Sequence, residues 1–152
     1  MAPAHRLIAV LSVAALVACQ RTPVPTPEAP ASPEATLGQF LAAVNANDHG
    51  RMAELWGDER GPSSVMLRNN GAKRDSLMTI YQHLLLTDSA HVIGSGPVPE
   101  KPSRRLLQVE LFRAERRTVV PFTMAPLRHG GWLVWGFDPA PLMPQVNAPA
   151  RR

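Results

Sequence analysis

The chain has 152 residues, a formal net charge of +4, one cysteine and sixteen prolines. This length leaves room for one domain. A single cysteine excludes an internal disulfide and any metal site built from several cysteines. The positive excess is small, so we expect no nucleic-acid partner.

The N-terminal segment carries a membrane-targeting signal. Residues 7–18 are almost wholly apolar, but they are fewer than the ~20 needed to span a bilayer core, as in a secretory leader. They end in Leu16-Val17-Ala18-Cys19, which resembles the lipobox of bacterial lipoproteins. The resemblance implies that residues 1–18 are a lipoprotein signal peptide. It also implies that Cys19 is the lipid attachment site, that acyl chains on Cys19 hold the protein to a membrane, and that the protein resides in the bacterial cell envelope.

Two proline-rich stretches flank the foldable sequence. In residues 19–32 prolines recur at short intervals, which favours an extended polyproline-like linker reaching roughly 40 Å. We expect one cone-like α+β domain over residues 33–138. Residues 139–152 are then a disordered, proline-rich tail.

Three helices are expected in the first half of the domain. Ser32-Pro33-Glu34 has the pattern of a helix start, and an apolar stripe follows from Leu37 to Val44. Asp48 can cap a second, short helix that ends at Gly57. A third helix runs from Lys73 or Asp75 to about Leu86, with one apolar face made of Leu77, Ile80, Tyr81, Leu84 and Leu85. In the turn-rich stretch between the second and third helices we expect only a short strand or turn at residues 65–67.

The second half alternates with period two, which predicts strands. We expect them at residues 90–94, 104–113, 118–124 and 132–137, with a loop from Gly94 to Pro102. Pro121 suggests an edge strand or a bulge. Residues 132–137 are apolar on both faces, which predicts a strand buried on both sides. The expected fold class is therefore α+β, with N-terminal helices packed on a curved, mainly antiparallel sheet of about four strands.

Two stretches suggest a family. The helix of residues 32–48, which closes on Asn45-Ala46-Asn47-Asp48, and the stretch from His129-Gly130-Gly131-Trp132 to Asp138 are similar to the cystatin-like cone fold of nuclear-transport-factor-two-like and SnoaL-like proteins. The resemblance implies a long helix packed into a strongly curved sheet, with the last strand near the middle of that sheet. It does not imply one function, because this fold hosts many.

Residues with catalytic potential are few. Glu110 shares a strand face with Leu106 and Phe112; on a concave face it could act as a general base, and on a convex face, which we favour, it is a solvated acid near arginines. Tyr81 is the other weak candidate, although a core role explains it. No spacing typical of metal ligands and no cofactor motif occurs, so we expect neither.

The expected function is non-enzymatic binding of a small apolar ligand or an envelope protein partner. An isomerase- or cyclase-like enzyme that uses the cone-fold pocket and a structural envelope scaffold are the alternatives. The sequence leaves the oligomeric state open, a homodimer included.

Overall fold

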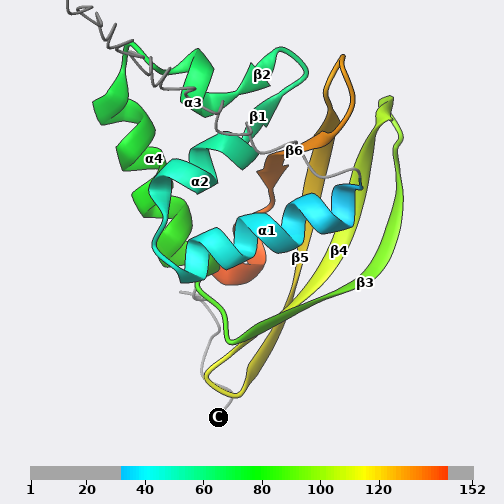
Figure 1. Ribbon diagram of the computed structural model, residues 1–152. Helices are drawn as coiled ribbons and strands as arrows, with labels where there is room; N and C mark the ends of the chain where they lie inside the picture. Colours follow the sequence, from blue (N-terminus) through cyan, green and yellow to red (C-terminus); the bar gives the residue numbers. More distant parts are fainter. Residues whose placement is uncertain (1–31, 144–152) are drawn as a thin grey trace, which may run out of the picture.

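The computed structural model describes residues 32–143, and it places a group of helices against one antiparallel sheet (Figure 1). The helices are α1 (Pro33–Asn45), α2 (His49–Leu55), α3 (Ser63–Met66) and α4 (Gly71–Leu85), with a 3-10 helix η1 (Ala140–Leu142). A small ladder joins β1 (Gly57–Asp58) to β2 (Gly61–Pro62). The main sheet has the order β3 (Ser89–Val98), β4 (Lys101–Arg113), β5 (Arg116–Pro126), β6 (Trp132–Phe137), all antiparallel. The expected α+β class is confirmed.

Side-chain caps explain where the helices begin. The Ser32 hydroxyl accepts a hydrogen bond from the Ala35 amide (3.1 Å), and the Asp48 carboxylate accepts one from the Arg51 amide (2.9 Å). Asn70 does the same at α4 by accepting from the Lys73 amide (3.2 Å). This cap sets the start of α4 at Gly71, which is earlier than the sequence pattern predicted.

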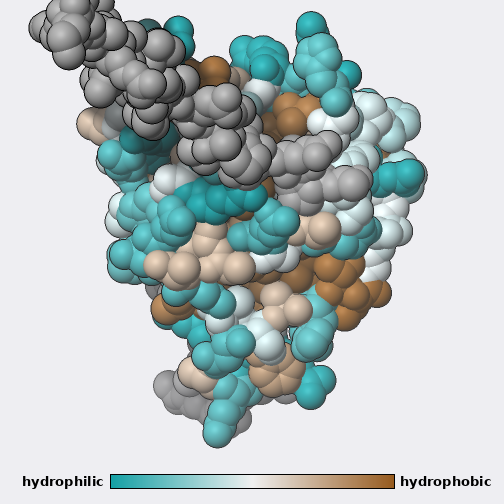
Figure 2. Space-filling model, in the orientation of Figure 1, coloured by the Kyte–Doolittle hydropathy of each residue, from teal (hydrophilic) through white to brown (hydrophobic). Residues whose placement is uncertain are grey.

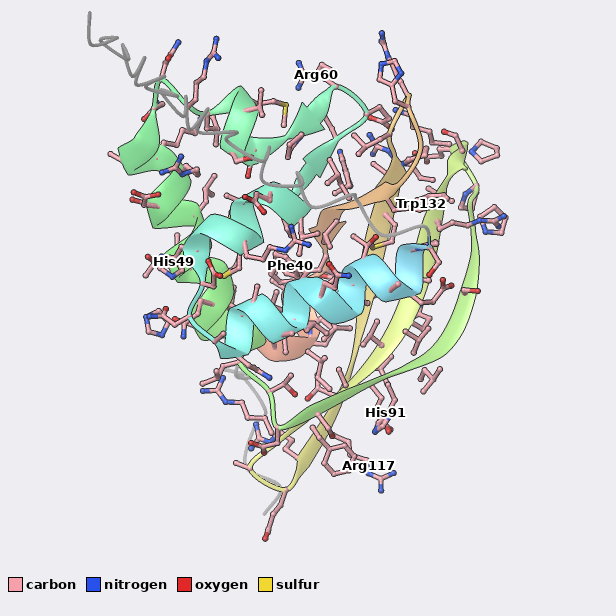
Figure 3. All side chains as sticks on the ribbon, in the orientation of Figure 1. Phe40, His49, Arg60, His91, Arg117 and Trp132 are labelled. Carbon is pink, nitrogen blue, oxygen red and sulfur yellow. The ribbon has the colours of Figure 1, made fainter. Side chains whose placement is uncertain are left out.

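One core lies between α1, α2, α4 and one face of the sheet. Figure 1 shows α1 crossing the concave side of the long, curved strands β3 to β5, and Figure 3 shows Phe40 pointing from α1 into this space. Alternate residues of β4 and β5 are buried there: Leu107, Val109, Leu111, Val120, Phe122 and Met124. Each such side chain contributes roughly 1.5–3 kcal/mol by leaving water, so this face is the main source of stability.

The link between α2 and α4 is more structured than predicted. Residues 65–67 form no strand: Val65 and Met66 end α3, which makes one helical turn over Ser63–Met66, and Leu67 begins the turn that follows it. The Ser63 amide donates to the Trp56 carbonyl (2.7 Å), and its hydroxyl donates to the Ala53 carbonyl (2.9 Å). These bonds bury Ser63 and hold α3 against the end of α2.

Strand β3 is longer than predicted, because the stretch Gly94–Pro97 pairs with β4 instead of forming a loop. β3 lies at one edge of the sheet, so its residues need hydrogen bonds on one side only and tolerate glycine and proline. The register shifts between Val92 and Gly94. Figure 2 shows an apolar patch over the middle of β3, where Val92 and Ile93 are exposed.

Strand β6 is at the opposite edge of the sheet, and the expectation of a last strand near the middle is wrong. Within the described part of the chain, the backbone pairing beyond it is an isolated parallel bridge between Trp56 and Val134. The expectation of burial on both sides is met at the adjacent residues Leu133 and Val134, which are both buried, and fails at Trp135, which is 46% exposed. Val134 packs into the core, whereas Trp135 is only partly covered.

The structure also differs from the expectations for Pro121 and for Ile80. Pro121 lies in β5, an interior strand, where its carbonyl accepts from the Asp138 amide (3.0 Å) just past the end of β6. An amide hydrogen at this position would point toward the same residue, Asp138, which lies past the end of β6, so proline removes no bond from the β5–β6 ladder itself. On α4, Ile80 is 52% exposed and Met78 is fully buried in its place.

Candidate functional site: a cavity beside the β4–β5 hairpin

The structure places Glu110 on the outer face of the sheet, opposite the buried residues of β4. Its neighbour across the ladder is His91 of β3, and Arg117 Nη1 lies 3.9 Å from its Oε1. Figure 3 shows His91 and Arg117 directed away from the helices. Glu110 therefore lies outside the helix-covered face where a cone-fold general base would have to act.

Tyr81 is half-buried in an aromatic cluster on the helix side of the sheet. Its ring centroid lies 4.3 Å from that of Trp56 and 5.5 Å from that of Phe137. Burial raises the pKa of the Tyr81 hydroxyl. The two candidates are not brought together, because Tyr81 packs against the core and Glu110 lies on the opposite face of the sheet.

Cys19 lies outside the described residues, so its lipid attachment stays a prediction. Within residues 32–143 none of the helices is long and apolar enough to cross a membrane. The same residues contain no group of three or more His, Cys, Asp or Glu side chains placed to hold a metal ion.

A cavity of about 320 Å³ opens between the end of α4, the β4–β5 hairpin and η1. This volume is within the range of roughly 300–1,000 Å³ for small-molecule sites. Apolar side chains from segments far apart in the chain line part of the cavity: Leu84, Leu86, Leu111, Pro141, Leu142 and Met143. The exposed surface of the lining as a whole is more polar than apolar. Leu111 is buried, whereas Leu86 and Met143 are exposed, so the apolar lining is open to solvent on one side.

Two arginines stand at this cavity as direct cross-strand neighbours. The β4–β5 register pairs Leu111 with Thr118 and Arg113 with Arg116, and all four side chains line the cavity. Arg113 Nη1 donates to the His83 carbonyl (3.2 Å). Among the described residues, neither guanidinium has a carboxylate oxygen within 4.0 Å. Like charges directly opposite each other destabilise a strand pair, so an anion bound between them would relieve a repulsion.

The turn that joins these arginines is strained. Ala114 and Glu115 have φ values of 48° and 65°, in the left-handed region that glycine or asparagine normally occupies in a two-residue hairpin. Left-handed backbone costs about 1–2 kcal/mol for an L-residue. The Ala114 amide donates to the Asp88 carboxylate (3.0 Å), which holds the turn against the start of β3.

A hydrogen-bonded corner supports the other wall of the cavity. Asn45 donates from Nδ2 to the Thr87 carbonyl (2.9 Å) and accepts at Oδ1 from the Thr87 amide (3.2 Å). The buried Thr87 hydroxyl lies 2.6 Å from the Phe112 carbonyl oxygen. The segment that carries Leu84 and Leu86 is thereby tied to both α1 and β4, so the cavity is formed before any ligand arrives.

No family model, curated protein or solved structure matches this chain. Its function is therefore argued from its own residues. The sequence reasoning missed this cavity, although two arginines flanking the expected polar turn after β4 were a local signal for it.

Proposed function

We propose that this protein is a lipid-anchored component of the bacterial envelope that binds an amphipathic anion in the cavity beside the β4–β5 hairpin. The ligand class is an alkyl chain that ends in one carboxylate or phosphate group. One observation carries the proposal: Arg113 and Arg116, cross-strand neighbours with no carboxylate partner among residues 32–143, stand beside the apolar side chains of one cavity.

The energetics favour such a ligand. An alkyl chain gains roughly 0.8 kcal/mol for each CH₂ that it buries, and the leucine side chains offer that burial. A hydrogen bond between a guanidinium and an anionic oxygen adds about 1.5–3 kcal/mol. A neutral analogue gains only the first contribution, and a cationic analogue is repelled by both arginines.

The lining supports binding over catalysis. Among residues 32–143, the arginines are the only titratable side chains of the lining, and a guanidinium stays protonated at every pH of interest. General acid–base chemistry of the isomerase or cyclase type needs a group that can give up and recover a proton. Neither Tyr81 nor Glu110 lines the cavity.

The anchor part of the proposal rests on Leu16-Val17-Ala18-Cys19. We expect Cys19→Ser to abolish incorporation of labelled fatty acid and to move the protein from the membrane fraction to the soluble fraction. If the variant stays in the membrane fraction and the wild type takes up no label, the anchor is refuted.

Calorimetric titration of the full chain tests the ligand. We expect decyl phosphate and decanoate, below their micelle concentrations, to bind more tightly than decanol, and decyltrimethylammonium not to bind. The comparison of phosphate with carboxylate tells which head group is preferred. Arg116→Gln should weaken binding of the anions about tenfold, the loss expected when one charged contact of ~1.4 kcal/mol is removed.

The matched control is Arg117→Gln, which removes the same charge from the next residue on the opposite face of β5. The proposal fails if neither anion binds, if decanol binds as tightly as the anions, or if the two arginine variants lose the same affinity.

A further inference from the structure

A second cleft, of about 610 Å³, lies beside the β1–β2 ladder and shares no lining residue with the hairpin cavity. Figure 3 shows Arg60, which lines it, at the opposite end of the view from Arg117. Its apolar residues are Trp56, Met66, Leu67, Leu77 and Trp135, and its polar side chains are Asp58, Arg60, Ser63 and Lys73. Helices α3 and α4 contribute one side, and β1 and β6 contribute the other.

Trp135 is the most unusual residue of this cleft, because a large aromatic side chain is left 46% exposed on an edge strand. The guanidinium carbon of Arg104 lies 4.0 Å from the centroid of its ring. Arg104 is not part of the cleft lining, so the part of the indole that borders the cleft is not covered by the guanidinium. Trp135 thus lines the cleft with part of its side chain exposed.

A pair of ionic contacts holds Arg104 in that place. Its Nε and Nη2 atoms lie 2.7 and 3.1 Å from the two carboxylate oxygens of Glu59, and the Arg104 side chain is only 12% exposed. Lys101 Nζ lies 2.9 Å from Glu59 Oε1. Glu59 lies in the turn between β1 and β2, so its bidentate ion pair with Arg104 joins the β1–β2 ladder to β4. The indole is thus oriented in advance, which lowers the entropic cost of stacking a ligand on it.

Among the described residues, the charges of the cleft leave one cation, Lys73, without a carboxylate partner. Arg60 is paired with Asp58, with Nη2 and Oδ2 2.6 Å apart. Lys73 has no carboxylate oxygen within 4.0 Å among residues 32–143. In this part of the chain, the cleft therefore combines an aromatic side chain, aliphatic walls and an ammonium group that has no carboxylate partner among residues 32–143.

We propose that this cleft is a second binding site, specific for a planar aromatic molecule that carries a carboxylate. Its ring stacks on Trp135, and its carboxylate meets the ammonium group of Lys73. Arg104 and Glu59 act as positioning residues that hold the indole in place. This site differs from the hairpin cavity in ligand class, and the two proposals stand or fall separately.

Titration of the full chain with 2-naphthoate, followed by tryptophan fluorescence and calorimetry, tests the site. We expect binding of 2-naphthoate, weaker binding of the neutral 2-naphthalenemethanol, and none of cyclohexanecarboxylate or of a neutral oligosaccharide. Trp135→Leu should weaken 2-naphthoate binding about tenfold, and Trp135→Phe should weaken it less. Because Trp135 is partly exposed, circular dichroism of the variants should match that of the wild type.

Lys73→Gln should weaken 2-naphthoate binding and leave 2-naphthalenemethanol unaffected. Arg68→Gln is the matched control, because Arg68 is an exposed cation of the α3–α4 link that does not line the cleft. The proposal is overturned if 2-naphthoate does not bind, if the Trp135 variants bind it as the wild type does, or if the oligosaccharide competes with it. It is also overturned if Arg116→Gln abolishes the binding, because the ligand would then occupy the hairpin cavity.

Discussion

The side chain of Asn45 joins the end of α1 to the segment between α4 and β3, and its removal is a direct test of this architecture. The amide group both donates to the Thr87 carbonyl (2.9 Å) and accepts from the Thr87 amide (3.2 Å), across 42 positions of the chain. Both bonds are partly buried. Asn45→Ala deletes them together and leaves the two backbone groups of Thr87 without these partners.

The expected cost is the sum of two hydrogen bonds. Each contributes about 1 kcal/mol net, and an unsatisfied, partly buried backbone group raises that figure. We therefore expect Asn45→Ala to lower the free energy of unfolding by about 2 kcal/mol. Asn45 contributes little else, because its side chain is largely exposed.

Urea unfolding monitored by tryptophan fluorescence measures this loss as a lower midpoint with an unchanged slope. The matched control is Asn69→Ala, an exposed asparagine in the α3–α4 link, for which we expect a change within about 0.5 kcal/mol. A loss below about 0.5 kcal/mol for Asn45→Ala would show that the corner is not held as described.

Three further predictions concern the turns and the ladder. Gly57→Ala should lower the free energy of unfolding by more than about 2 kcal/mol, because the added Cβ would overlap the Gly61 carbonyl oxygen and lie 2.8 Å from Pro62 Cα. Its control is Gly38→Ala on α1, where the added Cβ meets open space, and which should stabilise the protein by up to ~1 kcal/mol. Equal effects of the two changes in thermal melts would contradict this prediction. Ala114→Gly should raise the free energy of unfolding by about 0.5–1 kcal/mol by relieving the left-handed backbone at φ 48°, and a loss of stability would refute the strain. The hydrogen bonds from Arg104 and Lys101 lower the pKa of Glu59 below its ordinary value of 4.5. This contribution to stability is present above pH 4.5 and is lost as the pH falls toward the lower folded-state pKa. The stability difference between wild type and Glu59→Gln should therefore be constant from pH 5 to 8 and shrink below pH 4.5; a difference that grows in acid would contradict the assignment.

The starts of the first two helices were readable from the sequence, because each depends on residues within one helical turn. Ser32 and Asp48 cap α1 and α2 through bonds to amides three positions ahead. Where such a local signal was overlooked, as at Asn70, the predicted start of α4 was late by a few residues.

The alternation in β4 was also a property of the sequence, but the face that it buries was not. Residues 107, 109 and 111 point one way and Glu110 points the other, whatever lies above or below the strand. Only the packing of α1, α2 and α4 decides which face leaves water. That placement put Glu110 outside the covered face.

The sequence alone determined the α+β class, the caps and the periodicity of the strands, since these follow from contacts between near neighbours. The tertiary structure decided that β6 is an edge strand, that Trp135 is exposed and that Arg113, Leu84 and Leu142 meet at one cavity. The physical reason is that burial and cavity shape depend on which distant elements pack together. An edge strand and a central strand can carry the same apolar residues until their neighbours are known.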